Sequence, residues 1–112
     1  MSLTIFLYDP TATYESEFGL YRANITHNLG EMAKEAGIYY ALWRPEEIDK
    51  TKAGELIELL EKGLADLKAR PEHFKQFDAP NGWGIYEHFV PFVEEYLNAC
   101  IEYPEAIIEA DR

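Results

Sequence analysis

Two long segments with apolar residues at helical spacing place the strongest constraint on how this chain folds. In each segment the apolar residues recur three and four positions apart, which puts them on one face of an α-helix. The two stripes are Leu56, Ile57, Leu60, Leu64 and Leu67 in residues 51–70, and Ile85, Phe89, Phe92, Val93, Tyr96, Leu97 and Cys100 in residues 85–103. The sequence therefore predicts two long amphipathic helices, and Pro71 and Pro104 are expected to end them.

Three residues inside these segments are unfavourable for a helix. Gly54 and Gly63 each weaken the first helix by about 1 kcal/mol, and their presence predicts close contact with another helix. Pro91 lacks a backbone donor and crowds the preceding turn. We therefore expect a kink or a break near residues 88–90.

A third helix is predicted in the first half of the chain. Asn24 is a favourable N-cap, and Gly37 has the place of a C′ residue, so a helix is expected over about residues 24–36. Its apolar stripe is Ile25, Leu29, Met32, Ala33 and Ala36. Residues 38–43 contain no polar break and fit either a short helix or a strand. Pro45, followed by two acidic residues, predicts one more helical turn.

Short apolar segments at the two ends of the chain predict strands. Residues 3–8 read as an inner strand or as one buried on both faces, and residues 106–110 read as a final strand. Because isolated strands are marginal, we expect the two to pair with each other. Residues 11–21 fit a helix, a strand or an ordered loop. The predicted fold is a single compact α+β domain over residues 1–112, predominantly helical with three to four helices, and with a small two-stranded sheet from the N- and C-terminal segments.

Charge limits the classes of partner. The chain has 112 residues with 21 acidic and 10 basic side chains, a net charge of −11, and it has no run of Lys or Arg. Direct binding to nucleic acid is therefore not expected, because such binding depends on cations that neutralise phosphates. The acidity is consistent with simple solubility, with a basic partner, or with mimicry of a nucleic acid.

Several kinds of site are absent from the sequence. Cys100 is the only cysteine, so no intramolecular disulfide forms, and a buried inert thiol is expected. The three histidines, His27, His73 and His88, lack the spacing of a zinc site, so no metal is predicted. No cofactor-binding motif is present. No signal peptide or membrane span is expected, and the predicted location is the cytoplasm.

A polar cluster near the predicted third helix is a candidate site. Asn24, His27 and Asn28 lie at positions i, i+3 and i+4, which a helix places on one side. A histidine between two amides can bind a polar ligand or transfer a proton near neutral pH. The alternative is purely structural, with Asn24 as a cap, Asn28 bonded to a loop backbone and His27 at the boundary of the core.

Two aromatic segments supply the other candidates. Trp43 and Arg44 could bind an anion, or instead form a tether in which Trp43 is in the core and Arg44 is paired with a carboxylate. Asn81 and Trp83 lie in a glycine-rich turn, where Trp83 either contacts a ligand or partner or fills the core.

Three segments resemble a known set of proteins. THNLGEMA at residues 26–33, LWRPEE at 42–47 and NGWGIY at 81–86 are similar to segments shared by small proteins of bacteria and bacteriophages that have no assigned activity. The likeness covers most of residues 22–112. It implies a bacterial or prophage origin and a cytoplasmic location, and it identifies no catalytic residue.

The sequence favours a non-enzymatic binding or interaction protein, with a protein partner or a second copy of the chain. The alternative is a small-molecule-binding protein or enzyme with a polar site around His27, Asn28 and Arg44. A third hypothesis is nucleic-acid mimicry towards a basic protein. No catalytic motif distinguishes among them.

Overall fold

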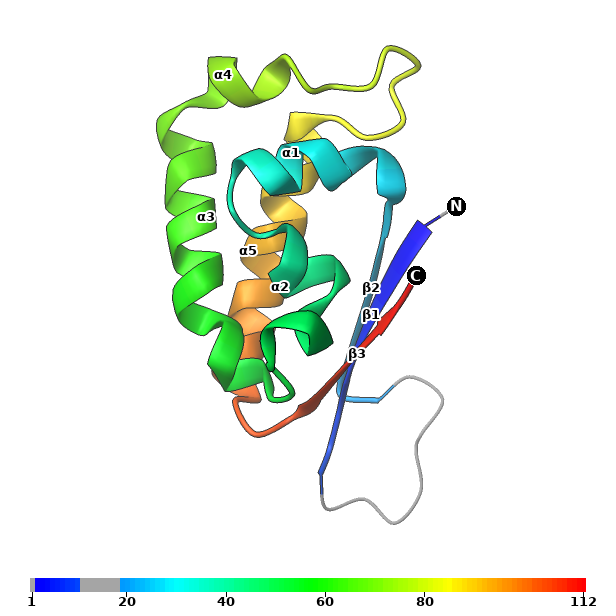
Figure 1. Ribbon diagram of the computed structural model, residues 1–112, viewed down its shortest axis with the longest axis vertical. Helices are drawn as coiled ribbons and strands as arrows, with labels where there is room; N and C mark the ends of the chain where they lie inside the picture. The colour runs from blue at the N-terminus through cyan, green and yellow to red at the C-terminus, as the bar shows by residue number, and fades with distance from the viewer. Residues whose placement is uncertain (1, 11–18) are drawn as a thin grey trace.

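A computed structural model, which describes residues 2–10 and 19–112, shows an antiparallel sheet with helices packed on one face (Figure 1). The strands are β1 (Ser2–Tyr8), β2 (Tyr21–Thr26) and β3 (Ile107–Asp111), in the order β2-β1-β3. The terminal strands pair as predicted, but the predicted two-stranded sheet is wrong because β2 pairs with the other side of β1. The sequence left residues 11–21 open between a helix, a strand and an ordered loop, and residues 11–18 of this segment lie outside the described residues.

The described part of the chain contains five α-helices, so the prediction of three to four is wrong. They are α1 (Gly30–Glu35), α2 (Tyr39–Trp43), α3 (Ile57–Ala69), α4 (Pro71–Lys75) and α5 (Tyr86–Glu102). Three 3-10 helices join them, η1 (His27–Leu29), η2 (Pro45–Ile48) and η3 (Ala53–Leu56). Glycine and proline divide the chain into these short pieces, since Gly37 separates α1 from α2 and Pro71 separates α3 from α4.

β1 is the central strand, and its alternation defines the two faces of the sheet. Leu3, Ile5 and Leu7 are completely buried under the helices, whereas the residues between them are only half-buried. The prediction of an inner strand is confirmed. Side chains alternate between the two faces along a strand. Tyr21, Ala23 and Ile25 of β2 are in register with the three buried leucine and isoleucine residues of β1, so they face the same core.

The predicted helix over residues 24–36 begins later than expected. Asn24 belongs to β2 and does not cap a helix; its register partner is Thr4 in β1. Thr26 is the cap, because its hydroxyl accepts a hydrogen bond from the Asn28 amide at 3.2 Å. If residues 24–26 were helical, they would lose their backbone hydrogen bonds to β1. The strand pairing of β2 therefore takes these residues, and the helix starts after them.

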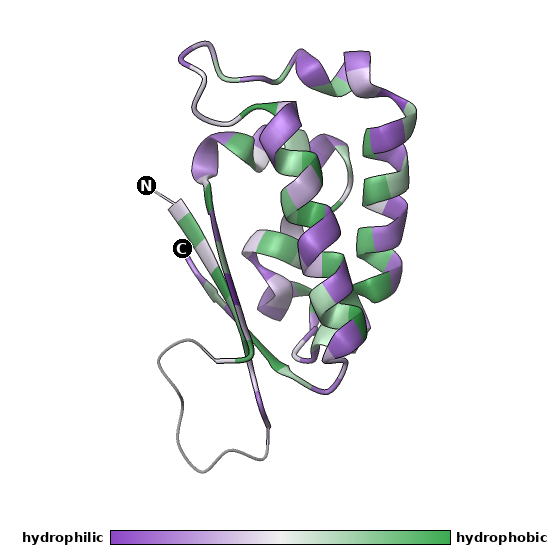
Figure 2. Ribbon diagram, turned by 180° about the vertical axis from the view of Figure 1, so that it is seen from behind, coloured by the Kyte–Doolittle hydropathy of each residue, from purple (hydrophilic) through white to green (hydrophobic). Residues whose placement is uncertain are grey.

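The two long amphipathic helices are confirmed as α3 and α5, which both alternate between hydrophobic and hydrophilic stretches (Figure 2). α5 runs without a break through Pro91, so of the two predicted alternatives, a kink at Pro91 or a break near residues 88–90, the break is wrong. Phe89, Phe92 and Val93 are buried on both sides of the proline, and this packing holds the helix together despite the missing backbone bond.

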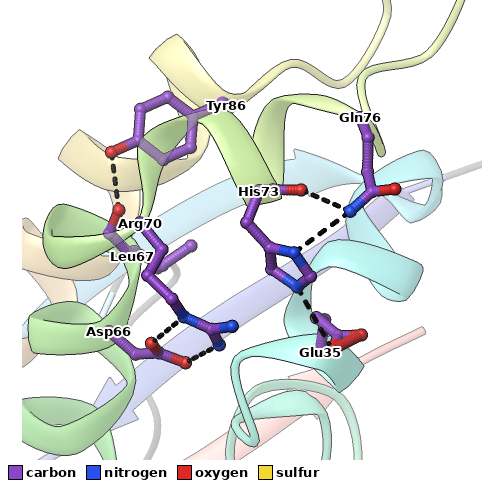
Figure 3. A network of polar contacts seen from close by, with 7 residues as sticks. All are labelled: Glu35, Asp66, Leu67, Arg70, His73, Gln76 and Tyr86. Carbon is purple, nitrogen blue, oxygen red and sulfur yellow. Dashed lines mark hydrogen bonds and ion pairs between the residues drawn. The ribbon is translucent and has the colours of Figure 1, made fainter.

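The junction of α3, α4 and α5 fixes the loop that precedes α5 (Figure 3). The Tyr86 hydroxyl donates to the Leu67 carbonyl at 2.7 Å, and the Tyr86 amide donates to the Asp78 carboxylate at 2.7 Å. On α4, Gln76 donates to the His73 carbonyl at 2.8 Å, and the His73 ring lies 3.4 Å from the Glu35 carboxylate. These contacts hold both ends of residues 76–85.

The core contains the one cysteine and a buried phenol. Burial raises the pKa of the Cys100 thiol to about 12, which keeps it protonated and agrees with the predicted inert thiol. Tyr96 is completely buried, and its hydroxyl finds no nitrogen or oxygen partner among the described residues. The neighbouring Cys100 thiol is a weak partner for that hydroxyl.

Within residues 2–10 and 19–112, none of the helices combines the length and the apolarity that crossing a bilayer requires.

Gly63→Ala is expected to destabilise the protein. A Cβ atom at Gly63 would overlap the Cγ2 methyl of Ile38, the residue before α2, so the close contact predicted for this glycine is with the start of a helix. Overpacking costs about 1–3 kcal/mol, which exceeds the gain of about 1 kcal/mol that alanine brings to a helix. Urea unfolding measures the balance. When Ile38 is first replaced by alanine, Gly63→Ala should lower the free energy of unfolding by less. An increase in the free energy of unfolding of the otherwise native protein would contradict this packing.

Candidate functional site

An open cleft of about 900 Å³ lies where β2 passes into η1, facing the loop before α5. Among the described residues, its walls are mainly neutral polar side chains with a few apolar ones, and histidine is the only titratable type. The lining residues are Ser2, Asn24, Ile25, Thr26, His27, Asn28, Leu29, Asn81, Gly82, Trp83, Gly84 and His88. Five of the seven predicted site residues therefore share one cleft.

Trp83 is the most exposed large apolar side chain of the described residues, with 71% of its surface accessible. Its backbone is nevertheless held on both sides. The Trp83 amide donates to the Asn81 side chain at 3.0 Å, and the Asn28 side chain donates to the Trp83 carbonyl at 2.8 Å. The interpretation of Trp83 as a residue that fills the core is wrong, and two of the candidate amides serve to hold this loop.

Gly84 allows the loop to approach η1. Its φ of +107° is unfavourable for any residue with a side chain, and a Cβ atom would lie 2.9 Å from the Cβ of Asn28. The bond between Asn28 and Trp83 therefore depends on glycine at this position. A further loop bond, from the Gly82 amide to the Ala79 carbonyl at 3.0 Å, closes the turn.

His27 is held in one tautomer by the buried Trp43. The indole N–H of Trp43 donates to Nδ1 of His27 at 2.8 Å, and the two rings lie 6.3 Å apart. Because an indole nitrogen only donates, Nδ1 must accept, and the neutral ring carries its proton on Nε2. Within the described residues Nε2 has no hydrogen-bond partner, so the histidine, which lines this cleft, keeps a free donor.

Asn24 lies on the outer face of the sheet and not on a helix. Its side-chain amide donates to the Ser2 hydroxyl at 3.0 Å and to the Thr4 hydroxyl at 2.8 Å. The predicted grouping of Asn24 with His27 and Asn28 is met in the cleft, but the reason is the end of a strand and not helical periodicity.

Arg44 lines a second hollow, of about 590 Å³, together with His27, Asn28 and Trp43. It pairs with the Glu47 carboxylate at 2.8 Å and donates to the Tyr39 hydroxyl at 3.4 Å; these bonds raise its pKa further above its usual value. Trp43 is only 3% exposed and stacks on Tyr39. The structure thus has the features of the predicted tether, a buried tryptophan and an arginine paired with a carboxylate.

Sequence reasoning did not include Ser2, Thr26 and His88 in the site. Thr26 follows the alternating residues Tyr21, Ala23 and Ile25, a signal that would have placed the end of a strand there. The contribution of Ser2 depends on strand pairing across more than twenty positions, which local patterns do not show.

Among the residues that the structure describes, no three His, Cys, Asp or Glu side chains are grouped so that they could hold a metal ion. Comparison of the chain with protein-family models, curated proteins and solved structures finds no match in any of the three. The resemblance of the three segments stays a prediction.

Trp43→Phe should release the tautomer of His27. The substitution removes the donor to Nδ1 while it keeps an aromatic ring in the core, so both neutral tautomers become populated. A nitrogen–proton correlation spectrum of the imidazole, recorded with the ring neutral, distinguishes the two forms. Trp83→Phe is the control, because the donor to Nδ1 is Trp43 and not Trp83, so this replacement should leave the Nε2–H form in place. A mixture in the unmodified protein would contradict the assignment.

Proposed function

We propose that this protein is a non-catalytic binding protein that recognises a segment of another protein in the cleft beside Trp83. The observation that carries the proposal is the indole ring of Trp83, 71% exposed on a loop whose backbone is hydrogen-bonded on both sides. Exposing so much apolar surface is unfavourable in water. Tryptophan is also among the residues that contribute most binding energy at protein interfaces.

The state of His27 favours recognition over catalysis. A general base needs an unprotonated nitrogen that faces the substrate, but the free nitrogen of His27 carries the proton and the other accepts from Trp43. Changing the tautomer would break that bond. His27 therefore acts as a hydrogen-bond donor to the partner.

The charge of the protein favours a basic partner. The net charge of −11 attracts cations from a distance, while the cleft lining contains no Lys, Arg, Asp or Glu among the residues that the structure describes. Uncharged residues of the partner would enter the cleft, and basic residues of the partner would lie on either side of them, outside the cleft. The same charge disfavours direct contact with a nucleic acid.

A small polar ligand is the second candidate, and the size of the cleft favours it. A volume of about 900 Å³ is within the range of small-molecule sites, and the cleft joins Asn24, His27 and Asn28. Titration of the isotope-labelled protein with a metabolite library distinguishes the two. Shifts confined to His27, Asn28 and Trp83 would support a small ligand, and their absence would count against it.

The origin and location of the protein are part of the proposal. The likeness of residues 26–33, 42–47 and 81–86 to small bacterial and phage proteins supports an accessory factor of bacterial or prophage origin that works in the cytoplasm. Localisation of a tagged chain in a bacterial host tests this, and secretion into the medium would contradict it.

Trp83→Ala should weaken partner binding strongly. Peptides of about twelve residues, longer than a typical strand, are selected from a display library against the full chain. Loss of an anchoring tryptophan at an interface costs about 2 kcal/mol or more, so affinity should fall at least about 30-fold.

Tyr40→Ala is the matched control, since Tyr40 is 49% exposed and lies outside the cleft lining. Affinity should be retained in this variant. Failure to select any peptide, or equal losses in both variants, would contradict the proposed function.

A further inference from the structure

We infer that the partner segment is an extended, positively charged peptide that pairs as an additional strand with the free edge of β2. The inference rests on the proposed function and identifies the conformation and charge of the segment that enters the cleft. It derives from the hydrogen-bonding pattern of the sheet, from the position of the cleft at the end of this edge, and from the charge of the chain.

The two edges of the sheet differ. The outer edge of β3 is covered where the strand begins, because the Ile108 amide donates to the Thr51 carbonyl at 3.0 Å and Lys52 bridges to Ile107. β2 pairs only with β1. Within residues 2–10 and 19–112, no backbone group bonds to the outer edge of β2, so this edge is open to another strand.

The pattern of the ladder identifies the open groups. The Leu20 amide donates to the Leu7 carbonyl at 2.7 Å, so the carbonyl of Leu7 points towards β2. In an antiparallel pair, alternate residues direct their backbone groups towards the partner. Leu7 is in register with Tyr21, and the alternation continues through Ala23 and Ile25.

The backbone groups of the intervening residues must then point away from β1. These are the N–H and C=O groups of Arg22 and Asn24, which face outward from the sheet. Because Arg22 and Asn24 are two positions apart, an added strand can form hydrogen bonds with the N–H and C=O groups of both residues.

The open edge leads directly into the cleft. Asn24 carries open backbone groups and also lines the cleft, together with the next residues Ile25 and Thr26. Trp83 lines the same cleft from the loop before α5. A peptide paired with Arg22 and Asn24 would therefore bring its continuing residues to the indole ring, which joins backbone recognition to a side-chain anchor.

Charge determines the chemistry of the peptide. The chain carries a net charge of −11. Burial raises the pKa of Tyr21 in β2 to about 12, and the nearby Glu95 carboxylate of α5 adds to this shift. Arg22 is the cation on this strand, and its guanidinium lies 5.9 Å from the ring centre of Phe6 in β1. A peptide with lysine or arginine beside its anchoring residue complements this field, and an acidic peptide does not.

The test uses the peptides selected against the full chain. Each residue of a binding peptide is methylated in turn at its backbone nitrogen, which removes one donor and leaves the side chains unchanged. In a paired strand only alternate N–H groups face the protein. Affinity should fall at least tenfold at every second position, with small changes between. The selected peptides should be basic, and their binding should weaken as salt is added.

Arg22→Pro gives the reciprocal test on the protein. Proline removes an outward-facing N–H that β1 does not use, and proline is accepted on edge strands in that orientation. Binding should fall at least tenfold. Arg22→Ala is the matched control, since it removes the same side chain and keeps the N–H, so it should bind nearly as well. Thermal unfolding shows whether the proline variant is folded, and the methylation series decides the question if it is not.

The outcomes separate this inference from the function on which it rests. Peptides that depend on Trp83 but show no alternation on methylation, or that are acidic, would overturn the paired-strand inference and leave the proposed function standing. Failure to select any peptide would overturn both.

Discussion

The structure depends on one strand that is paired on both sides and buried on one face. β1 carries Leu3, Ile5 and Leu7 into the core, and the helices pack on that face. A shift of one residue in its register would turn these three side chains outward, so the buried face fixes the register with both neighbours. Through that register β1 also determines where β2 ends, and therefore where the cleft is.

The cleft results from a change of secondary structure at Thr26. The strand ends there because the threonine hydroxyl caps η1, and the next two residues then serve different partners. His27 accepts from the buried indole of Trp43, and Asn28 holds the carbonyl of Trp83. One connection between a strand and a helix thus joins the core, the first wall of the cleft and the loop that forms its second wall. Most polar groups of the site are structural, and the exposed indole remains for recognition.

Local sequence patterns predicted the elements whose stabilisation is local. The stripes of α3 and α5, and the proline at the start of η2, have physical causes within a few residues, and these predictions are correct. β2 was missed because Ile25 and Leu29 also fit a helical stripe, and strand pairing with a segment about twenty residues away outweighs that local preference. The break that was one alternative near residues 88–90 does not form for a related reason, since tertiary packing around Pro91 outweighs one lost hydrogen bond.

The candidate site shows the same division. The polar cluster and the glycine-rich turn were recognisable as candidates from residue type, but only the fold shows that they face each other across one cleft. The exposure of Trp83 could not be predicted either, because the same glycines permit an inward or an outward ring. Arg44 was grouped with His27 in sequence reasoning, and the two residues do line one hollow, but this is not the cleft that contains Trp83, and Arg44 pairs with Glu47 there.

The central claim is that Trp83 is an exposed ring on an ordered backbone. Nitrogen relaxation of the Trp83 amide in the free protein tests it most directly. Hydrogen bonds on both sides of the residue predict an order parameter close to that of rigid backbone, about 0.85. A value below about 0.6 would show that the loop is mobile on the fast timescale, that the bonds to Asn28 and Asn81 do not hold it, and that the cleft has no preformed second wall.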